Sequence, residues 1–582
     1  MNTAAFALVL SPVLIYLVAA LLEKRRVVAP SEFFLAAGQV SSFEFANSSI
    51  GYGFQIASVS IFFAWGYLYG FGALVNPVFW GVGIVLFAWL LPRMTSYLGS
   101  GKTLHGYLGE RYNSRALEVV ASLVTLIGFL GTFVAELAWG SAVFKMFSPN
   151  PLIVGAILTG IATVIAIYLV RAGQLNAMRT DQVQLIFTYF GFLALGVALI
   201  WLAAAGDADA KAMSFILSGA LALCLIIMVI MIWRQIKLER RLATSERFEL
   251  TQFVRPVLLA LLAIAVFMLA ANLFRSWPGG DSVRTAVTSP RFFNLSQGTA
   301  NLLSLALLPL FWQFVDVTMW QRLAAVQLPP QTGSLRERLR PIRIGLQRFA
   351  FESPVTWLFA IIIGIVLRYA PIGVTEATIW DGIGSIPIAL RDSQHALGQT
   401  FGAMLALAFG AAIVAAMLST ADSMLMGALV VFSLDLAPKA GQAAEPRPSV
   451  ATSASAIRTG RVAIVLFIAV GLGIIWFQLL TNVQVLPILL GAYAAQISLA
   501  ACVLGTLLLP SNTVHRGWAI ASVLAGVAAT AYATAVALGN AEWQLYAPLF
   551  ALGASVPIYV IGVRVDRLHL RTKSVSRSGG AE

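Results

Sequence analysis

The chain has 582 residues, of which 59% are hydrophobic and 11% are charged, and its formal net charge is +13. Because an ordinary soluble domain has about 25% charged residues, this composition excludes a water-soluble globule. In a membrane protein an excess of Lys and Arg marks the cytoplasmic loops rather than a polyanionic ligand. Two cysteines occur, Cys224 and Cys502, both within apolar runs, which excludes a disulfide framework and a cysteine-based metal site.

Long apolar runs follow one another along the whole sequence. A run of about 20 apolar residues crosses a bilayer as a helix, and we count about 15 such runs. The runs are too long and too uniformly apolar to be strands of a membrane barrel. The sequence therefore predicts an all-α polytopic membrane protein. The predicted spans are 4–22, 43–69, 73–92, 116–147, 152–170, 180–204, 213–233, 255–274, 299–320, 349–369, 398–434, 458–477, 482–509, 515–538 and 545–563.

The basic residues predict the orientation of these spans. No basic segment precedes the first run, and the residues Glu-Lys-Arg-Arg follow it at 23–26, which favours an uncleaved anchor with a cytoplasmic flank at 23–42. The N-terminus then lies outside, the C-terminus lies inside, and most of the 38 Lys and Arg fall in cytoplasmic connections. Two of these, 234–255 and 322–348, are strongly basic. We interpret them as loops near anionic lipid headgroups rather than as a nucleic-acid site, and a cytoplasmic partner stays open.

The span 43–69 carries signs of an interruption. Its polar run Asn47, Ser48 and Ser49 is followed by Gly51 and Gly53. This pattern suits an unwound stretch whose carbonyls face a cavity, or an intact helix packed closely through small residues.

The span 299–320 contains Pro309 at its centre, which frees a backbone carbonyl and leads either to a kink or to a break. Interrupted helices that open corresponding halves of a chain are typical of inverted-repeat transporters, where they mark the central site. The pair of candidate interruptions therefore indicates a transporter.

The densest intramembrane polar cluster is the run 416–423, Ala-Met-Leu-Ser-Thr-Ala-Asp-Ser. Ser419 and Ser423 share one face of a helix, so their hydroxyls and an exposed carbonyl can converge on a hard cation. Alternatively the hydroxyls bond to backbone carbonyls or to another helix. Asp422 favours a functional role, because an ionisable group inside a membrane helix is costly.

Six other acidic residues lie within or beside the predicted spans. Glu136 and Asp316 lie deeper, where each could pair with a basic residue or carry a proton. The other four lie near helix ends and could reach headgroups or loop arginines: Glu44, Asp181, Glu352 and Asp435.

Four segments resemble the sodium:solute symporter family, the group that includes bacterial proline and pantothenate permeases and sodium/galactose transporters. The most specific is MLSTADSMLMGALVVFSLDLAP at 417–438, which is similar to the signature of the eighth core helix. The segment 169–184 keeps Thr180, Asp181 and Gln184 of a family motif but has Arg171-Ala172 where paired glycines are usual. The other two similar segments are TLHGYLGERYNSRALEVVASLV at 103–124 and FWQFVDVTMWQRLAAVQ at 311–327.

The resemblance implies a leucine-transporter-type fold of two inverted five-helix repeats, at 43–204 and 299–509. The remaining parts are a peripheral first helix with its loop (1–42), an inserted helix pair without counterpart in the family pattern (205–298), two C-terminal helices (510–565) and a short cytoplasmic tail (566–582).

The resemblance also implies a Na⁺ site and a solute site. The Na⁺ ligands would be the side chains of Ser419 and Thr420 and the carbonyls of Ala416, Phe45 and Ser48. The residues bordering the solute would be Asn47, Ser49 and Gly51, together with the segment from Pro309 to Gln313.

The main hypothesis is a secondary active transporter of a bacterial inner membrane, which imports a small organic solute such as an amino acid or carboxylate with Na⁺ as coupling ion. One alternative is proton coupling on the same fold, the possible coupling acids being Asp422, Asp316, Glu136 and Asp181. The other is a membrane solute sensor that keeps the pocket but no longer cycles. A membrane enzyme is disfavoured, because the four histidines are scattered over loops and ends.

Overall fold

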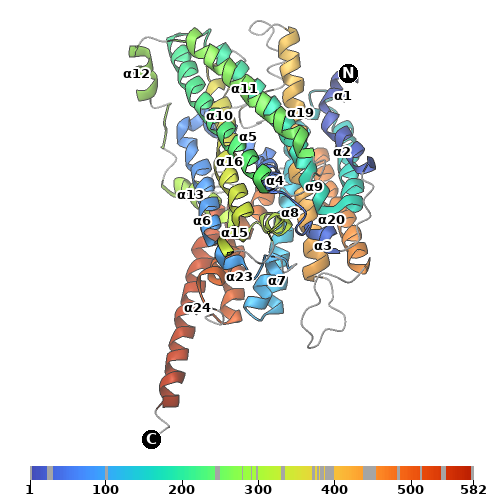
Figure 1. Ribbon diagram of the computed structural model, residues 1–582, viewed down its shortest axis with the longest axis vertical. Coiled ribbons are helices and arrows are strands. Elements are labelled where there is room, and N and C mark those ends of the chain that lie inside the picture. Colours follow the sequence, from blue (N-terminus) through green and yellow to red (C-terminus); the bar gives the residue numbers. More distant parts are fainter. Residues whose placement is uncertain are drawn as a thin grey trace.

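Helices account for nearly all of the chain that the computed structural model describes (Figure 1). Within the described ranges the only β-type pairings are two isolated bridges. The described residues are 3–22, 30–98, 102–242, 250–277, 280–289, 292–295, 299–329, 334–369, 374–375, 379, 386, 399–436, 454–481, 486–510, 514–538 and 546–578.

Twelve described helices are long and apolar enough to cross a membrane, and a bent pair of helices gives a thirteenth candidate span. Such lengths and hydropathies make the chain an integral membrane protein, as the sequence predicts. The orientation and the full number of spans stay predictions. The long helices are α6 (Val75–Leu90), α8 (Arg115–Phe144), α9 (Pro151–Ala203, which holds two spans), α10 (Ala208–Leu242), α11 (Leu250–Arg275), α16 (Arg340–Leu367), α19 (Gln399–Val430), α20 (Ala454–Thr481), α21 (Leu486–Ala495) continued by α22 (Ala500–Leu508), α23 (Arg516–Ala537) and α24 (Ala547–Ser578).

The predicted spans 4–22 and 43–69 each consist of two shorter helices. The first is α1 (Thr3–Val9) and α2 (Ser11–Leu22), and the second is α4 (Ser42–Gly53) and α5 (Ile56–Tyr69). The helix continues through Gly51 and Gly53 and is broken at Phe54 and Gln55, whose φ/ψ angles are −85°/56° and −66°/129°. Of the two alternatives, the structure shows the interruption, which lies just after the glycines rather than at them.

The second broken helix consists of α13 (Thr299–Val315) and α14 (Val317–Ala325), which meet at Asp316 with a bend of 45°. Of the two alternatives at Pro309, a kink or a break, the break is excluded, since Pro309 lies inside α13. Gly83 of α6 packs against the carbonyl oxygens of Pro309 and Leu310, so the neighbouring helix approaches closely here. The chain breaks seven residues later, where the Asp316 side chain caps the next helix.

Helix α9 joins the predicted spans 152–170 and 180–204 through one irregular residue. Gly173 has φ 66° and ψ −160°, a conformation that side-chain-bearing residues rarely adopt. A Cβ atom at this position would also lie 2.5 Å from the carbonyl oxygen of Phe33, in α3 (Pro30–Leu35). The requirement for glycine at 173 thus has both a conformational and a steric cause.

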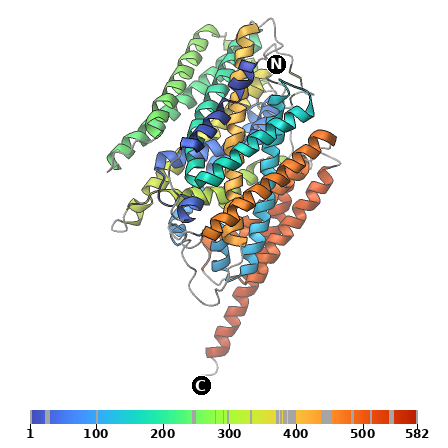
Figure 2. The same ribbon diagram turned by 90° about the vertical axis from the view of Figure 1, so that its right-hand side faces the viewer.

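Helices α4 and α5 lie in the middle of the bundle in Figure 1, and the pair α10–α11 lies along one side of it in Figure 2. Helix α24 projects beyond the other helices and ends at Ser578, so the segment predicted as a short polar tail is helical over most of its length. The short helix α7 (Leu104–Arg111) precedes α8 and packs against it.

Helices α5 and α16 pack so closely that a methyl group has no room between them. A Cβ atom on Gly364 would lie 2.2 Å from the carbonyl oxygen of Phe63, whereas one on Gly473 of α20 would meet nothing within 4 Å. We expect Gly364→Ala to destabilise the protein by about 1–3 kcal/mol, because overpacking forces the backbones apart.

Gly473→Ala is the matched control, and alanine is the better helix former by about 1 kcal/mol. The apparent melting temperature of the detergent-purified protein should fall for Gly364→Ala and stay constant or rise for Gly473→Ala. Equal melting temperatures for the two variants would contradict the close approach.

Candidate functional site

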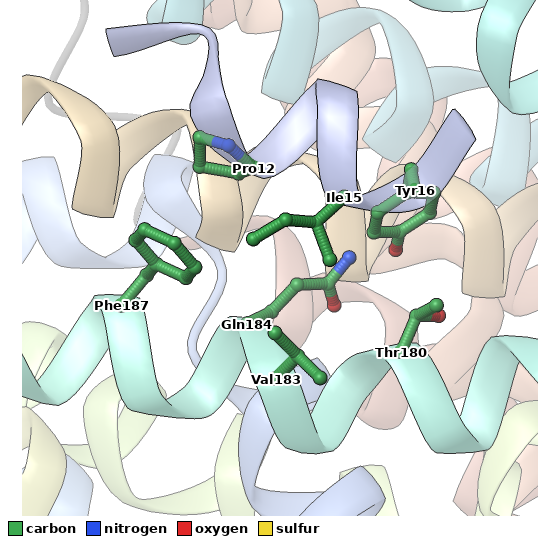
Figure 3. A pocket seen from close by; sticks show the side chains of 7 residues that line it. All are labelled: Pro12, Ile15, Tyr16, Thr180, Val183, Gln184 and Phe187. Atoms are coloured by element: carbon green, nitrogen blue, oxygen red, sulfur yellow. The ribbon is translucent and has the colours of Figure 1, made fainter. Parts of the chain in front are cut away.

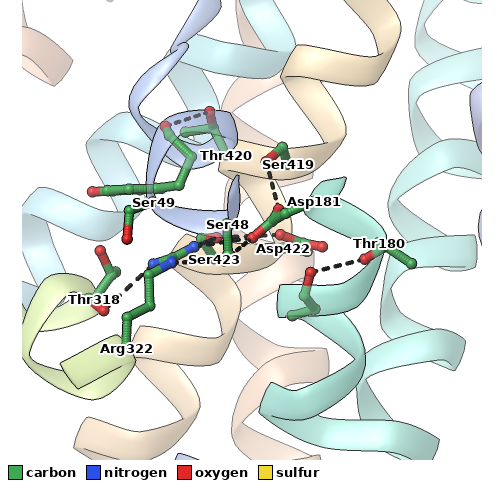
Figure 4. Close-up of polar contacts among 12 residues, drawn as sticks. Ser48, Ser49, Thr180, Asp181, Thr318, Arg322, Ser419, Thr420, Asp422 and Ser423 are labelled. Atoms are coloured by element: carbon green, nitrogen blue, oxygen red, sulfur yellow. Dashed lines mark hydrogen bonds and ion pairs between the residues drawn. The ribbon is translucent and has the colours of Figure 1, made fainter. Parts of the chain in front are cut away.

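A buried carboxylate, Asp181 of α9, lies where four helices meet (Figure 4). Ser48 of α4 donates a hydrogen bond to its Oδ2 (2.5 Å), and Ser419 of α19 donates one to its Oδ1 (2.5 Å). Arg322 of α14 completes the set with Nη2 at 3.3 Å from Oδ2. The Asp181 residue is completely buried. One carboxylate thus joins both broken helices to α9 and α19.

Arg322 provides the positive charge of this cluster. Its Nε donates to the Ser48 hydroxyl (2.9 Å), its Nη2 donates to the Ser423 hydroxyl (2.7 Å), and its guanidinium carbon lies 4.5 Å from the ring centroid of Tyr52. The prediction that this arginine begins a basic cytoplasmic loop is wrong, because Arg322 lies in α14 and is 1% exposed. Charge counting cannot distinguish a loop arginine from one on the inward face of a short helix.

A second carboxylate, Asp422 of α19, lies beside the first. It accepts a hydrogen bond from the hydroxyl of Tyr16 at Oδ2 (2.6 Å) and one from Ser423 at Oδ1 (3.3 Å). Tyr16 belongs to α2, so the peripheral helix also reaches the cluster. Sequence patterns gave no sign of this contact, because Tyr16 and Asp422 are 406 positions apart.

The charges of this polar cluster do not balance. It brings together two carboxylates, Asp181 and Asp422, and one guanidinium, that of Arg322, all of them buried. A buried charge is costly unless it is paired. With both carboxylates ionised, one monovalent cation or one proton would neutralise the group.

The structure brings together several of the predicted Na⁺ ligands. The hydroxyls of Ser48 and Ser419 converge on Asp181, whereas the resemblance implies the carbonyl of Ser48 as a ligand. The Thr420 hydroxyl donates to the carbonyl oxygen of Tyr52 of α4 (3.5 Å). Ala416 lies one turn earlier in α19 and is buried. Phe45, in contrast, packs its ring against Gly345 of α16.

Residues predicted to border the solute lie in two different places. Asn47 is 3.5 Å from Gln182 through its Nδ2, and Ser49 faces the Met319 sulfur at 4.0 Å. Gly51 packs against α9 and α19, where a Cβ atom would lie 3.2 Å from the Asp181 carbonyl oxygen. These α4 residues therefore line the same region as the polar cluster.

The other predicted solute residues belong to α13. Pro309 faces α6 through its carbonyl oxygen, as described above. Gln313 lies three residues before the break, is 1% exposed, and has a side-chain nitrogen without a hydrogen-bond partner in the protein. A buried donor of this kind is costly, so it is available to a polar ligand.

Polar and aromatic residues missed by the sequence analysis surround the two breaks. Gln55, at the first break, is 4% exposed and has a side-chain nitrogen without a hydrogen-bond partner in the protein. Tyr493 of α21 lies near the second break, where it stacks on Trp312 of α13 with ring centroids 4.1 Å apart. No local signal identifies Tyr493, because it follows an ordinary apolar run.

Glu136 and Asp316 have the same structural role at the two breaks. The Glu136 carboxylate accepts the backbone N–H groups of Ile56 (2.9 Å) and Ala57 (3.2 Å), the first residues of α5. Asp316 accepts the N–H (2.9 Å) and hydroxyl (2.6 Å) of Thr318 at the start of α14. Each carboxylate thus caps the positive N-terminal end of a half-helix. Their expected role in coupling stays a prediction.

Three further acids form contacts away from the cluster. Glu352 pairs with Arg348 (2.5 Å), and Asp435 lies 2.9 Å from His105 Nδ1 and accepts a hydrogen bond from Thr103 (2.5 Å). Glu44 forms a capping box with Ser41 at the start of α4. All three acids are buried. Two of them contact arginines of predicted loops, as one of the two alternatives allowed: Glu352 pairs with Arg348, and Glu44 lies 3.7 Å from Nε of Arg179.

A small pocket, about the size of one water molecule, lies between α2 and α9. Figure 3 shows the Gln184 side chain pointing into it from α9, opposite Ile15 of α2. Both polar atoms of the buried Gln184 amide lack a hydrogen-bond partner in the protein. The pocket adjoins Tyr16 but is too small for an organic solute.

No protein-family model and no curated protein sequence matches the chain. Among solved structures, the chain is similar to the substrate-bound, outward-open state of a Na⁺-coupled sialic acid symporter, which is described as revealing a novel Na⁺ site. The sequence identity is 12%, the alignment covers 97% of this chain and 98% of that chain, and the TM-score is 0.61. At this identity the similarity shows the fold, and it confirms the predicted fold class.

The capping role of Asp316 can be separated from a role of its charge. Asn caps helices about as well as Asp, whereas Ala at a cap costs about 1 kcal/mol. We expect Asp316→Ala to lower the apparent melting temperature of the purified protein, and Asp316→Asn to retain the wild-type value. If Asn destabilised the protein as much as Ala, the charge and not the cap would be required.

Proposed function

We propose that the chain is a secondary active transporter that imports a small organic solute together with Na⁺ across a bacterial inner membrane by alternating access. The observation that carries this proposal is the bridge from Asp181 to Ser48, Ser419 and Arg322, which joins the two broken helices to α9 and α19. An ion bound among these groups would therefore act on both broken helices at once.

The chemistry of the cluster suits Na⁺. Its available donors are hydroxyl, carbonyl and carboxylate oxygens, the ligands that hard cations prefer. Gly51 allows α4 to approach α9 and α19 closely, which brings Ser419 within reach of Ser48 and Asp181. One Na⁺ would also neutralise the excess negative charge. Because the same helices carry the residues at the breaks, Na⁺ and solute should each increase the affinity for the other by the same factor.

The groups around the breaks favour an amino acid over a simple carboxylate as the solute. Gln55 and Gln313 offer buried amide nitrogens, and Tyr493 with Trp312 offers a flat aromatic surface. The carboxylates of Glu136 and Asp316 already occupy the N-terminal ends of α5 and α14. An ammonium group placed near these carboxylates would be attracted, whereas a solute carrying only negative charge would be repelled.

Uptake into proteoliposomes tests the Na⁺ coupling. With a panel of radiolabelled amino acids and short carboxylates, we expect uptake of at least one amino acid to rise with an inward Na⁺ gradient. Ser419→Ala combined with Thr420→Ala should raise the half-saturating Na⁺ concentration at least tenfold, because both hydroxyls face the cluster.

Thr163→Ala is the matched control, since it removes a hydroxyl from an exposed position of α9. It should leave the half-saturating Na⁺ concentration unchanged. Equal uptake in Na⁺ and choline buffers across a pH series would overturn Na⁺ coupling.

Proton coupling is the second candidate, and the contact between Asp422 and Tyr16 favours it. The Asp422 carboxylate is buried beside Asp181 and accepts a hydrogen bond from the Tyr16 hydroxyl. In this alternative it binds a proton, which takes the place of Na⁺ in balancing the charge of the cluster. In that case a pH gradient alone should drive uptake, and Asp422→Asn should abolish it. Uptake by Asp422→Asn that still follows a Na⁺ gradient would exclude Asp422 as a proton carrier.

A further inference from the structure

The helix pair α10–α11, which the sequence predicts as an insertion between the two repeats, contacts the N-terminal end of α4. Glu239 of α10 accepts the backbone N–H of Phe43 at Oε1 (2.6 Å). Arg255 of α11 pairs with Glu239 Oε2, and its guanidinium carbon lies 4.8 Å from the ring centroid of Phe43. Two helices from outside both predicted repeats thus meet on one residue of the first broken helix.

A second set of contacts extends this attachment to α16. Gln235 of α10 donates to the Ser42 hydroxyl (3.2 Å) and accepts from Arg348 Nη1 (3.2 Å). Arg348 pairs with Glu352, and its guanidinium carbon lies 4.7 Å from the Phe43 ring centroid. Ser42 in turn donates to the carbonyl oxygen of Pro341 (2.8 Å). The first turn of α4 is therefore bonded to α10, α11 and α16 together.

These contacts are not needed to terminate α4 itself. Ser41 and Glu44 already form a complete capping box at this end, in which each side chain accepts the backbone N–H of the other residue. Glu239 adds an anchor from a distant helix, 196 positions along the chain from Phe43. A helix N-terminus attracts a carboxylate, and here the carboxylate comes from the inserted pair.

The attachment reaches the second broken helix as well. The segment before α4 forms a short parallel bridge with the end of α14: Val40 donates to the carbonyl oxygen of Ala325 (3.0 Å), and Gln327 donates to that of Val40 (2.9 Å). Helix α4 carries Ser48 to Asp181, and α14 carries Arg322 to it. A restraint on the start of α4 therefore restrains both half-helices that reach the polar cluster.

We propose that Glu239, Gln235 and Arg255, the α10–α11 clamp, are positioning residues that hold α4 against α9 and α19 and thereby set the Na⁺ affinity of the Asp181 cluster. The proposal rests on the proposed function, in which Na⁺ binds among these groups. Transporters with broken central helices open and close by moving half-helices and bundles relative to one another. The clamp opposes the movement of α4 away from its neighbours, and Na⁺ opposes the same movement from the other end of the half-helix.

The test uses a reporter cysteine on α4 in the full chain with Cys224 and Cys502 replaced by serine. Ala46→Cys places the reporter one turn beyond Phe43, at a position that is completely buried. The purified protein is labelled with a hydrophilic maleimide at increasing Na⁺ concentrations. In the otherwise unchanged protein we expect slow labelling that Na⁺ slows further.

Glu239→Ala should raise the labelling rate in Na⁺-free buffer at least threefold. It should also raise, at least threefold, the Na⁺ concentration that produces half of the maximal decrease in the labelling rate. Glu239→Gln, which keeps the side-chain volume, should change both quantities in the same direction and serves if the alanine variant aggregates. Lys237→Gln, an exposed charge on the same helix, is the matched control and should change neither quantity.

Loss of overall structure is detected by a second reporter. Ala551→Cys, in the buried part of α24, should label at the same slow rate with and without the Glu239 substitution. If Glu239→Ala and Glu239→Gln both behaved like Lys237→Gln, or accelerated both reporters equally, the clamp would be refuted. If Na⁺ did not slow the labelling of Ala46→Cys in the protein with intact Glu239, the proposed function would be refuted instead. The clamp is tested separately, by the labelling rates in Na⁺-free buffer.

Discussion

The arrangement of the core depends on the Asp181 carboxylate, which is completely buried between helices from both predicted repeats. A carboxylate can be buried only if its oxygens accept hydrogen bonds and its charge is compensated, and here hydroxyls from α4 and α19 and a guanidinium from α14 do so. The requirement is reciprocal, because Arg322 is as deeply buried as its partner. The relative positions of these four helices are therefore linked to the charge state of one small cluster.

The breaks in the two central helices are stabilised by the same principle. A broken helix exposes backbone N–H groups that lipid and apolar side chains cannot satisfy. Glu136 satisfies those of α5, and Asp316 satisfies those of α14. Acidic residues inside the membrane thus have two separate tasks in this chain, since one pair caps half-helices and the other pair, Asp181 and Asp422, forms the polar cluster. Such a division would keep the breaks in place while the cluster exchanged the cation that we propose for it.

Much of this architecture could be predicted from the sequence, because hydropathy and length decide which segments form membrane helices. The break after Gly53 directly follows the polar run that indicated either a break or close packing, and such polar residues are rare at membrane depth. The sequence does not indicate the break at Asp316, because the visible local signal is Pro309 and the packing of Gly83 against it is not visible. Ser419 and Ser48 were identified as site residues through the family resemblance. Arg322, Tyr16 and Tyr493 were not, because their roles arise from contacts between residues that are far apart in the sequence.

The thermal stability of the purified protein in Na⁺ tests the central claim most directly, because it requires no knowledge of the solute. A ligand that binds only the folded state at 100 times its dissociation constant stabilises it by about 2.7 kcal/mol. We expect NaCl to raise the apparent melting temperature of the wild-type protein by several degrees relative to choline chloride at equal ionic strength, and Asp181→Asn to abolish the difference. Equal melting temperatures of the wild-type protein in the two salts, or the same Na⁺ shift in Asp181→Asn, would contradict the assignment of this cluster as the Na⁺ site.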